Sequence, residues 1–264
     1  KLHFFLKYRY KGPIFLLLHP FRTFSGAMSE RRTDQPAGMR EQTSWLSQFV
    51  TEARMRRFRE VLALRTRHLT IVLEDIFQPH NASAVLRSCE CFGIQDVHII
   101  ENRNRYQVNP DVALGSSKWL TLHQYHQSEN NTGPCLETLK KKGYRLVATT
   151  PHKNGHTPEE LPLDEKTALL FGTELHGLGK EALAMADGFV RIPMAGFTES
   201  LNISVSAATL LYVLTRRLRH SPVPWQLNQV DHDEVLLSFL ISSIPNAGKI
   251  LEEYQRKKNR GLQI

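Results

Sequence analysis

Short strand-like runs alternate with helix-like runs from Leu69 to about Pro193. The runs are LTIVLED, SAVLRSCECFG, VHII, SSKWLTLHQY, PCLETLKKKG, YRLVATT, ALLFG, KEALAMAD and FVRIP. Such alternation predicts an α/β fold with a mostly parallel sheet that carries helices on both faces. Gly93, Gly143 and Gly188 fall where helices should end. Because threaded chains are rare, these patterns by themselves predict an open sheet without a knot.

The charge of the chain favours a polyanionic partner. Its 264 residues, 41% of them hydrophobic, are enough to bury a core as one large domain or two small ones. The 34 Lys and Arg outnumber the 26 Asp and Glu, which gives a net charge of +8. This excess is typical of nucleic-acid binding, although the same charge also serves solubility alone.

The three cysteines suggest neither a disulfide framework nor a zinc site. Cys89 and Cys91 lie two apart in an expected helix and therefore on different faces, and no CxxC pair occurs, so we predict no metal. The apolar piece Ile14–Leu18 is bounded by Pro13 and Pro20 and is far shorter than the roughly 20 residues of a membrane span. We expect no membrane contact and a reducing, cytoplasmic location.

The N-terminal part divides into an extension and a basic segment. Residues 1–44 are expected to form an irregular, flexible extension, because residues 29–42 are polar, contain Pro and Gly, and lack periodicity. Residues 45–68 are expected to form a basic helical segment with an apolar side. That apolar side consists of Phe49, Ala53, Phe58, Val61 and Leu62. Six arginines crowd its other faces, and we interpret Arg54, Arg57 and Arg65 as contacts to RNA phosphates; the alternative is a solvated helix face.

The stretch Arg191–Leu214 joins a strand end, a loop and an apolar helix. Pro193 and Gly196 interrupt regular structure, and Ser200 or Asn202 offers a side-chain oxygen to cap the helix. Unpaired N–H groups at such a helix start can hold a polar ligand. The alternative is a core-packing helix with an ordinary cap.

Three stretches together resemble the SPOUT RNA methyltransferases. They are LEDIFQPHNASAVLRSCECFGI (Leu73–Ile94), LLFGTELHGLGKEAL (Leu169–Leu183) and IPMAGFTESLNISVSAA, in the order and approximate spacing of the three motifs of that family. The strings N-x-S-A-x-x-R-[ST], G-x-E-x-x-G-[LI] and I-P-M-x-G-x-x-x-S-L-N-x-S are similar to the TrmH branch, the tRNA ribose 2′-O-methyltransferases. The resemblance covers about Arg54 to the C-terminus.

This resemblance implies a fold that periodicity alone does not predict. SPOUT proteins bury their cofactor in a C-terminal trefoil knot, here equivalent to about Tyr144–Leu218, and act as homodimers whose sites lie at the subunit interface. The implied domains are a SPOUT methyltransferase domain at residues 69–219 and a C-terminal helical extension at residues 220–264. In the extension, Glu234–Leu240 and Ala247–Lys258 have a helical pattern. It either packs on the partner subunit or contacts RNA.

The resemblance also implies the catalytic residues. Arg87 matches the motif-one arginine that activates the ribose hydroxyl, either by taking its proton or by orienting the hydroxyl and the adjacent phosphate. An arginine is an unusual base, since its pKa is above about 12. Asn81 is implied to hold the arginine and the substrate, and Glu174 to position both. Ser200 and Asn202 are implied to complete the site.

Each of these residues has a purely structural alternative. Arg87 is three residues before Glu90 and is suited to a surface ion pair on one helix. Asn81 begins the same helix and is suited to cap it. Glu174 is a candidate capping carboxylate for the helix near Lys180.

For the methyl donor, S-adenosylmethionine, the resemblance implies a set of mostly uncharged contacts. Gly172, Ile192 and Leu201 match positions that touch the adenine and ribose, and Thr149 ends the strand beneath them. The string His176–Gly179 offers only G-x-G, which is too little for a dinucleotide fingerprint.

The implied function is 2′-O-methylation of a ribose in tRNA, at guanosine 18 of the D-loop, by a homodimer. Two alternatives remain: a ribosomal-RNA ribose methyltransferase of the same superfamily, and a non-catalytic RNA-binding protein that has kept the fold. The rRNA relatives often carry a separate N-terminal domain, whereas here a basic helix and an irregular extension precede the first motif. That difference favours tRNA.

Overall fold

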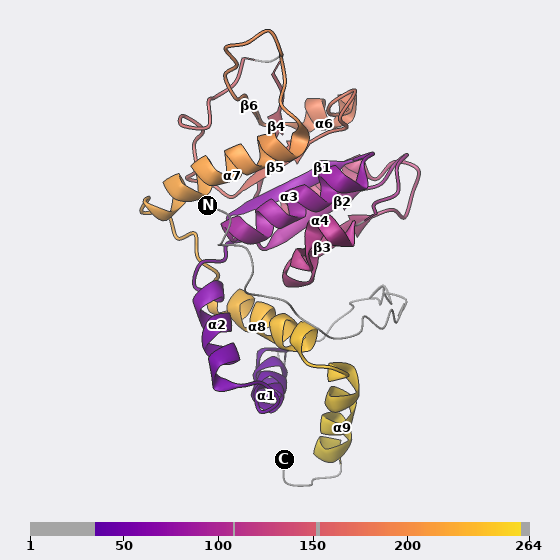
Figure 1. The fold of residues 1–264 in the computed structure, drawn as a ribbon, viewed down its shortest axis with the longest axis vertical. Coiled ribbons are helices and arrows are strands. Elements are labelled where there is room, and N and C mark those ends of the chain that lie inside the picture. Colours follow the sequence, from indigo (N-terminus) through magenta and orange to yellow (C-terminus); the bar gives the residue numbers. More distant parts are fainter. Residues whose placement is uncertain (1–34, 108, 152–153, 260–264) are drawn as a thin grey trace, which may run out of the picture. The chain divides into compact units, whose positions relative to one another are not determined.

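The computed structural model describes residues 35–107, 109–151 and 154–259, which are built around a six-stranded sheet. The strand order is β3-β2-β1-β5-β4-β6, and every neighbouring pair is parallel (Figure 1). The strands are β1 (Leu69–Glu74), β2 (Asp96–Ile100), β3 (Thr121–Tyr125), β4 (Arg145–Thr149), β5 (Thr167–Phe171) and β6 (Gly188–Val190). The predicted parallel sheet is confirmed. The trefoil knot expected over residues 144–218 stays a prediction.

Helices cover both faces of the sheet, as predicted. Side chains of a strand point alternately to its two faces, so in β1 Ile71 packs into one core and Val72 into another. The first core also contains residues of α3 (Pro79–Phe92) and α7 (Ile203–Arg219), which lie together in Figure 1. The second core contains residues of α5 (Thr132–Lys141) and α6 (Lys180–Met185).

Two of the three glycines expected at helix ends are found there. Gly93 ends α3 with φ 82° and Gly143 follows α5 with φ 79°, left-handed values that favour glycine. A Cβ on Gly93 would also lie 2.4 Å from the carbonyl oxygen of Leu64. The expectation for Gly188 is wrong, because this residue starts β6. After α6 the chain leaves through Ala186 in an extended conformation, which needs no glycine.

Four helices from the two ends of the described chain share a separate core. They are α1 (Gln35–Ser47), α2 (Glu52–Leu62), α8 (Gln229–Ser243) and α9 (Ala247–Asn259). Leu46, Phe58 and Phe239 are buried between them, and the ring of Tyr254 lies 5.7 Å from that of Trp45 (Figure 1). The C-terminal segment is therefore helical, as its sequence pattern indicates. We call these four helices the helical unit.

The N-terminal segment differs from the expected single helix over residues 45–68. The chain leaves the helical conformation after Ser47 and starts again at Glu52, because the Thr51 hydroxyl accepts a hydrogen bond from the N–H of Arg54 at 3.2 Å and caps α2. α2 ends at Leu62, so residues 63–68 are not helical. Residues 35–44 of the expected flexible extension belong to α1, and residues 1–34 lie outside the described residues.

One arginine ties the helical unit to the sheet. The guanidinium of Arg67 lies 3.1 Å from Asp96 at the start of β2 and 3.0 Å from Glu234 of α8, and it also contacts Asp231. A single half-buried guanidinium thus holds three segments of the chain together. The remaining elements, α4 (Pro110–Ala113) and η1 (Ser116–Trp119), lie between β2 and β3 in the sequence.

The described helices were compared with the length and hydropathy that a membrane span needs. Within the described ranges, no single helix is long and apolar enough to cross a bilayer, and the bent pair α8 and α9, which meet at 116°, reaches that length and composition only when both helices are taken together.

Candidate active site

A cavity of about 570 Å³ lies where β4, β5 and β6 end. Ligands of open α/β sheets commonly bind at the carboxyl ends of the strands. The four residues expected to touch the methyl donor all line this cavity, although they are far apart in the sequence: Thr149, Gly172, Ile192 and Leu201. We call it the donor cavity.

Gly172 is required by a close approach within the cavity wall. A Cβ at this position would lie 2.0 Å from the carbonyl carbon of Gly177. The loop that follows folds back on itself, since the N–H of Thr173 donates to the carbonyl of Gly177 at 2.9 Å and the reverse bond is 3.0 Å. Gly177 itself has φ 67°. The loop can take this shape only with glycine at position 172.

A chain of hydrogen bonds joins the three sequence motifs. Asn81 of α3, which is 3% exposed, donates from its amide to the carboxylate of Glu174 at 2.9 Å. Its amide oxygen accepts from the amide of Asn202 at 3.1 Å. Asn202 also caps α7, because its side-chain oxygen accepts from the N–H of Ser204 at 2.8 Å. Asn202 thus has both the capping role and the motif-joining contact.

Glu174 caps α3, whereas the alternative interpretation placed it on the helix near Lys180. Its carboxylate accepts from the backbone N–H groups of Phe77 and Gln78, each at 3.2 Å, where α3 begins. The capping expectation for Asn81 is wrong, since the N-cap is Gln78 and Asn81 sits further along the first turn. Burial by itself would raise the pKa of Glu174, but the hydrogen bonds from Asn81 and the backbone outweigh it and hold that pKa below its ordinary value. Glu174 is therefore an ionised acceptor at neutral pH.

The other two expected catalytic residues occupy different places. Ser200 is exposed and lines the donor cavity. Arg87 is exposed on α3, is absent from the lining of the donor cavity, and has no hydrogen bond or ion pair with any residue that the structure describes. The expected surface pair between Arg87 and Glu90 is wrong, because Glu90 binds Arg65 instead at 3.0 Å. Arg87 is thus a free guanidinium at the surface.

The structure corrects the prediction for Arg65. This side chain is 1% exposed, donates to the carbonyl of Ile94 at 2.9 Å, and lies over the ring of Phe239 at 5.7 Å. An arginine enclosed in this way is structural and has no surface to offer a phosphate. Arg54 and Arg57 are exposed on α2, as an RNA contact requires.

Glu74 is a site residue that sequence reasoning missed. It is 5% exposed and accepts hydrogen bonds from the hydroxyl of Thr132 and the N–H of Gly179, both at 2.7 Å. It thereby fixes the far end of the loop that carries Glu174. A carboxylate directly at the end of the LTIVLED strand was the available signal.

The described residues contain no metal-ligand cluster. Among residues 35–107, 109–151 and 154–259, no group of three His, Cys, Asp or Glu side chains is placed to hold an ion.

A doubly covered parallel sheet with a loop-built cavity at its carboxyl edge places the chain in the class of α/β proteins, which commonly bind their ligands at that edge. Residues 68–212 of the chain match the SpoU rRNA Methylase family, and the match spans more than half of the sequence. The chain therefore belongs to this family, and the resemblance to TrmH-type SPOUT proteins is confirmed.

Individual relatives agree with this assignment. The tRNA (guanosine(18)-2′-O)-methyltransferase of Borreliella burgdorferi is 44% identical over 201 residues, which cover 76% of this chain and 90% of the relative. The crystal structure of the A. aeolicus TrmH/SpoU tRNA modifying enzyme has a TM-score of 0.65 and 28% identity, and the match covers 74% of this chain and 98% of that one. AviRb of Streptomyces viridochromogenes in complex with AdoMet shares the fold, with a TM-score of 0.50, 23% identity, and coverage of 61% and 62%.

Proposed function

We propose that this protein transfers the methyl group of S-adenosylmethionine to the 2′-hydroxyl of a ribose in tRNA, at guanosine 18. The observation that carries this proposal is the 44% identity to the Borreliella enzyme over 90% of that enzyme's length. The joined motif residues Asn81, Glu174 and Asn202 beside the donor cavity support it.

The donor cavity fits the methyl donor. Its walls carry the half-buried side chain of Ile192 and the exposed side chain of Leu201, two apolar groups that suit an adenine ring. Backbone groups of the loop from Gly172 are available for polar atoms. The hydroxyl of Thr149 donates to the carbonyl of Leu170 at 2.8 Å, so this side chain is fixed at the floor of the cavity. S-adenosylmethionine supplies an electrophilic methyl group, and the protein supplies position.

Arg87 activates the ribose hydroxyl in this proposal, by taking its proton or by orienting it together with the adjacent phosphate. Because Arg87 is absent from the donor cavity of its own chain, the reaction requires a second subunit to complete the site. α3 and α7 present a surface suited to such a homodimer. Their neighbouring aromatic rings, Phe92 and Tyr212, lie 6.2 Å apart, and Tyr212 and Val205 are 52% and 48% exposed.

The tRNA binds partly through the basic surface of α2. Arg54 and Arg57 are exposed there, and the chain as a whole carries a net charge of +8. Lys258 of α9 is engaged with Glu41 of α1, so some of the C-terminal charge is used within the helical unit. We place the catalytic domain at residues 69–219, with the helical unit as its RNA-binding supplement. The proposed reaction needs no metal or membrane and suits the cytoplasm.

One labelling experiment tests the proposal. The full chain is incubated with methyl-labelled S-adenosylmethionine and a tRNA transcript, and the modified nucleotide is mapped. We expect label on the ribose of guanosine 18 and none on a transcript with 2′-deoxyguanosine at that position. Label on a base, or no label and no binding of S-adenosylhomocysteine, contradicts the proposal. Because the matching family is described by rRNA methylation, a parallel incubation with rRNA separates the two substrates.

A further inference from the structure

A second cavity, of about 820 Å³, lies on the other side of the loop that walls the donor cavity. Residues 173–178 line both cavities, with Glu174 in the shared wall. The rest of the second cavity is formed by residues 74, 75, 77, 78, 102–104, 129, 130, 132 and 179–181. Its volume lies within the range of about 300–1,000 Å³ that is typical of small-molecule sites.

The floor of the second cavity is built from carboxylates that are already used. Asp75 has φ 54°, and in this bent conformation its Oδ1 accepts from the backbone N–H groups of Asn102 at 2.7 Å and Arg103 at 2.9 Å. Glu74 is occupied by Thr132 and Gly179. The floor is therefore preformed. Its carboxylate oxygens already accept hydrogen bonds from protein donors, so they are poorly suited to bind a cation.

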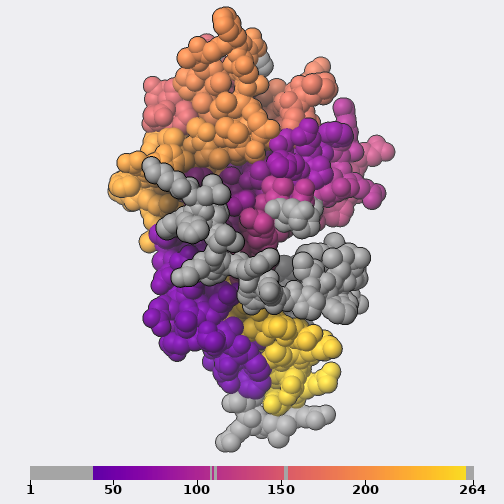
Figure 2. All heavy atoms as spheres, viewed as in Figure 1, coloured from indigo at the N-terminus to yellow at the C-terminus, as the bar shows by residue number. Residues whose placement is uncertain are grey.

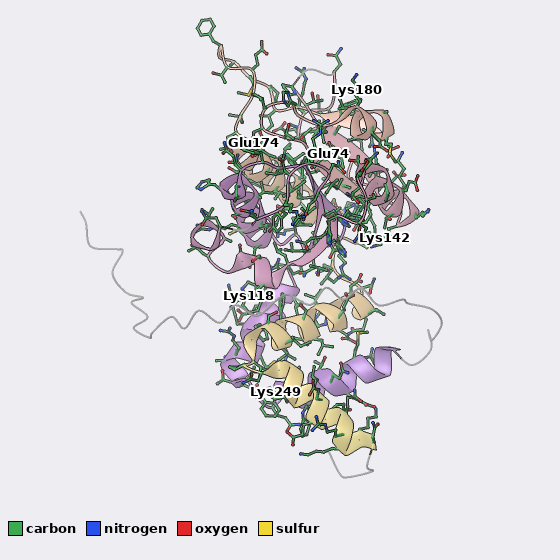
Figure 3. The ribbon with its side chains drawn as sticks, turned by 90° about the vertical axis from the view of Figure 1, so that its right-hand side faces the viewer. Glu74, Lys118, Lys142, Glu174, Lys180 and Lys249 are labelled. Atoms are coloured by element: carbon green, nitrogen blue, oxygen red, sulfur yellow. The ribbon has the colours of Figure 1, made fainter. Side chains whose placement is uncertain are left out.

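The rim of the second cavity, in contrast, carries side chains without partners. The cations of Arg103 and Lys180 and the carboxylate of Glu129 make no side-chain hydrogen bond or ion pair with any described residue, and all three line the cavity. Phe77 at the same rim is 70% exposed and Leu175 is 84% exposed. Figure 3 shows Lys180 near Glu74 and Glu174 at one end of the sheet. Donors, an acceptor and an exposed aromatic ring thus surround one hollow.

We propose that the second cavity receives the guanine base of the nucleotide whose ribose is methylated, an inference that rests on the proposed function. Guanine presents O6 and N7 as acceptors, which suit Arg103 or Lys180, and N1–H and N2–H as donors, which suit Glu129. Phe77 supplies a ring on which an unstacked base can lie. A base seated there has its ribose at the wall shared with the donor cavity. Glu174 and its loop then lie between the base and the methyl donor, while the ribose reaches the donor cavity.

The test measures base selectivity together with transfer kinetics. Wild type, Arg103→Ala, Glu129→Gln and Phe77→Ala are given transcripts with guanosine or inosine at the target position; inosine lacks the 2-amino group. Lys142→Ala, an exposed lysine outside the second cavity, is the control.

We expect Arg103→Ala and Phe77→Ala to raise KM for tRNA about tenfold, with unchanged affinity for S-adenosylhomocysteine. Wild type should prefer guanosine to inosine about tenfold, and Glu129→Gln should reduce this preference to about twofold or less. If the wild type is active but the three variants have the same KM and selectivity as Lys142→Ala, the inference about the second cavity is wrong while the proposed function stands. The inference is also wrong if Phe77→Ala turns a dimer into a monomer in sedimentation, since Phe77 is then a subunit contact. An inactive wild type overturns the proposed function as well.

Discussion

The amide of Asn202 donates to the amide oxygen of Asn81 at 3.1 Å, a contact between residues 121 positions apart in the sequence. Through Asn81 this contact extends to Glu174, so α3, the loop after β5 and the start of α7 are held by one buried side chain. Figure 2 shows the segment that leads into α7, in orange, at the surface of the molecule. The geometry of the donor cavity therefore depends on the amide of Asn81.

Asn81→Ala should disturb both the site and the fold. It removes a donor from Glu174 and leaves the amide of Asn202 without this partner, which we expect to cost about 1–2 kcal/mol of unfolding free energy. Methyl transfer should fall about tenfold or more, since reacting groups tolerate little misplacement. Urea unfolding and single-turnover methylation measure the two effects. Ser88→Ala, which removes a hydroxyl bonded only to the carbonyl of Ala84 on the same helix, is the control and should change neither much.

Arg87→Ala should separate catalysis from stability. Because the side chain is exposed and unpaired among the described residues, we expect the unfolding free energy to change by less than about 0.5 kcal/mol. The transfer rate should fall about a hundredfold or more if Arg87 activates the hydroxyl, while S-adenosylhomocysteine binds as in wild type. Arg87→Lys keeps the charge but loses the planar fork, so partial recovery distinguishes charge from geometry. Near-normal turnover by the alanine variant would remove Arg87 from the mechanism.

Arg65→Ala should destabilise the fold far more than Arg57→Ala. Removing Arg65 empties a fully buried side-chain position and takes away the donors to the carbonyl of Ile94 and to Glu90, which we expect to cost about 3 kcal/mol of unfolding free energy. Arg57 is exposed and pairs only with the exposed Glu60, so its loss should cost less than about 0.5 kcal/mol.

Measurement of tRNA binding tests whether Arg57 contacts a phosphate. Arg57→Ala should weaken tRNA binding and reduce the dependence of log affinity on log salt by about one. Filter binding between low and moderate salt measures this slope. An unchanged slope for Arg57→Ala would count against a phosphate contact at this position.

The strands and the cavity could be predicted from the sequence because local rules determine them. Alternating runs indicate the strands and helices, and the loop around Gly172 and Ile192 follows strand ends, where ligands of parallel sheets bind. The family resemblance selected Asn81, Glu174 and Asn202, and the structure brings these three together. Periodicity does not predict which side chains, distant in the sequence, contact one another in the fold.

Arg65 illustrates the limit. Arg65 and Arg57 lie in the same basic stretch, and the sequence around them does not distinguish their environments. Because α2 ends at Leu62, Arg65 lies beyond the helix and its side chain is buried. Its partners Glu90 and Phe239 lie 25 and 174 positions away in the sequence, so their proximity depends on the assembled fold. In the same way Glu174 caps a helix that precedes it by almost a hundred residues, a pairing that no local pattern indicates.

A buried histidine, His98, should make the protein sensitive to acid. The rings of His98 and His123 are stacked at 4.5 Å, and His98 is 1% exposed. Burial, assisted by the nearby charge of His123, lowers the pKa of His98 from 6.5 to about 3. The unfolded chain therefore binds a proton below pH 6.5 that the native protein does not take up until about pH 3.

The sign of the effect follows from this difference in proton binding. The contribution of neutral His98 to stability is complete above pH 6.5 and is lost as the pH falls from there towards 3, by up to about 1.4 kcal/mol per pH unit. His98→Gln, whose amide can still hydrogen-bond the Tyr125 hydroxyl that lies 3.2 Å from His98 Nδ1, should flatten this slope. Urea unfolding at pH 7, 6 and 5 measures it, with the exposed His220→Gln as control. Equal slopes in wild type and His98→Gln would show that other groups govern the acid sensitivity.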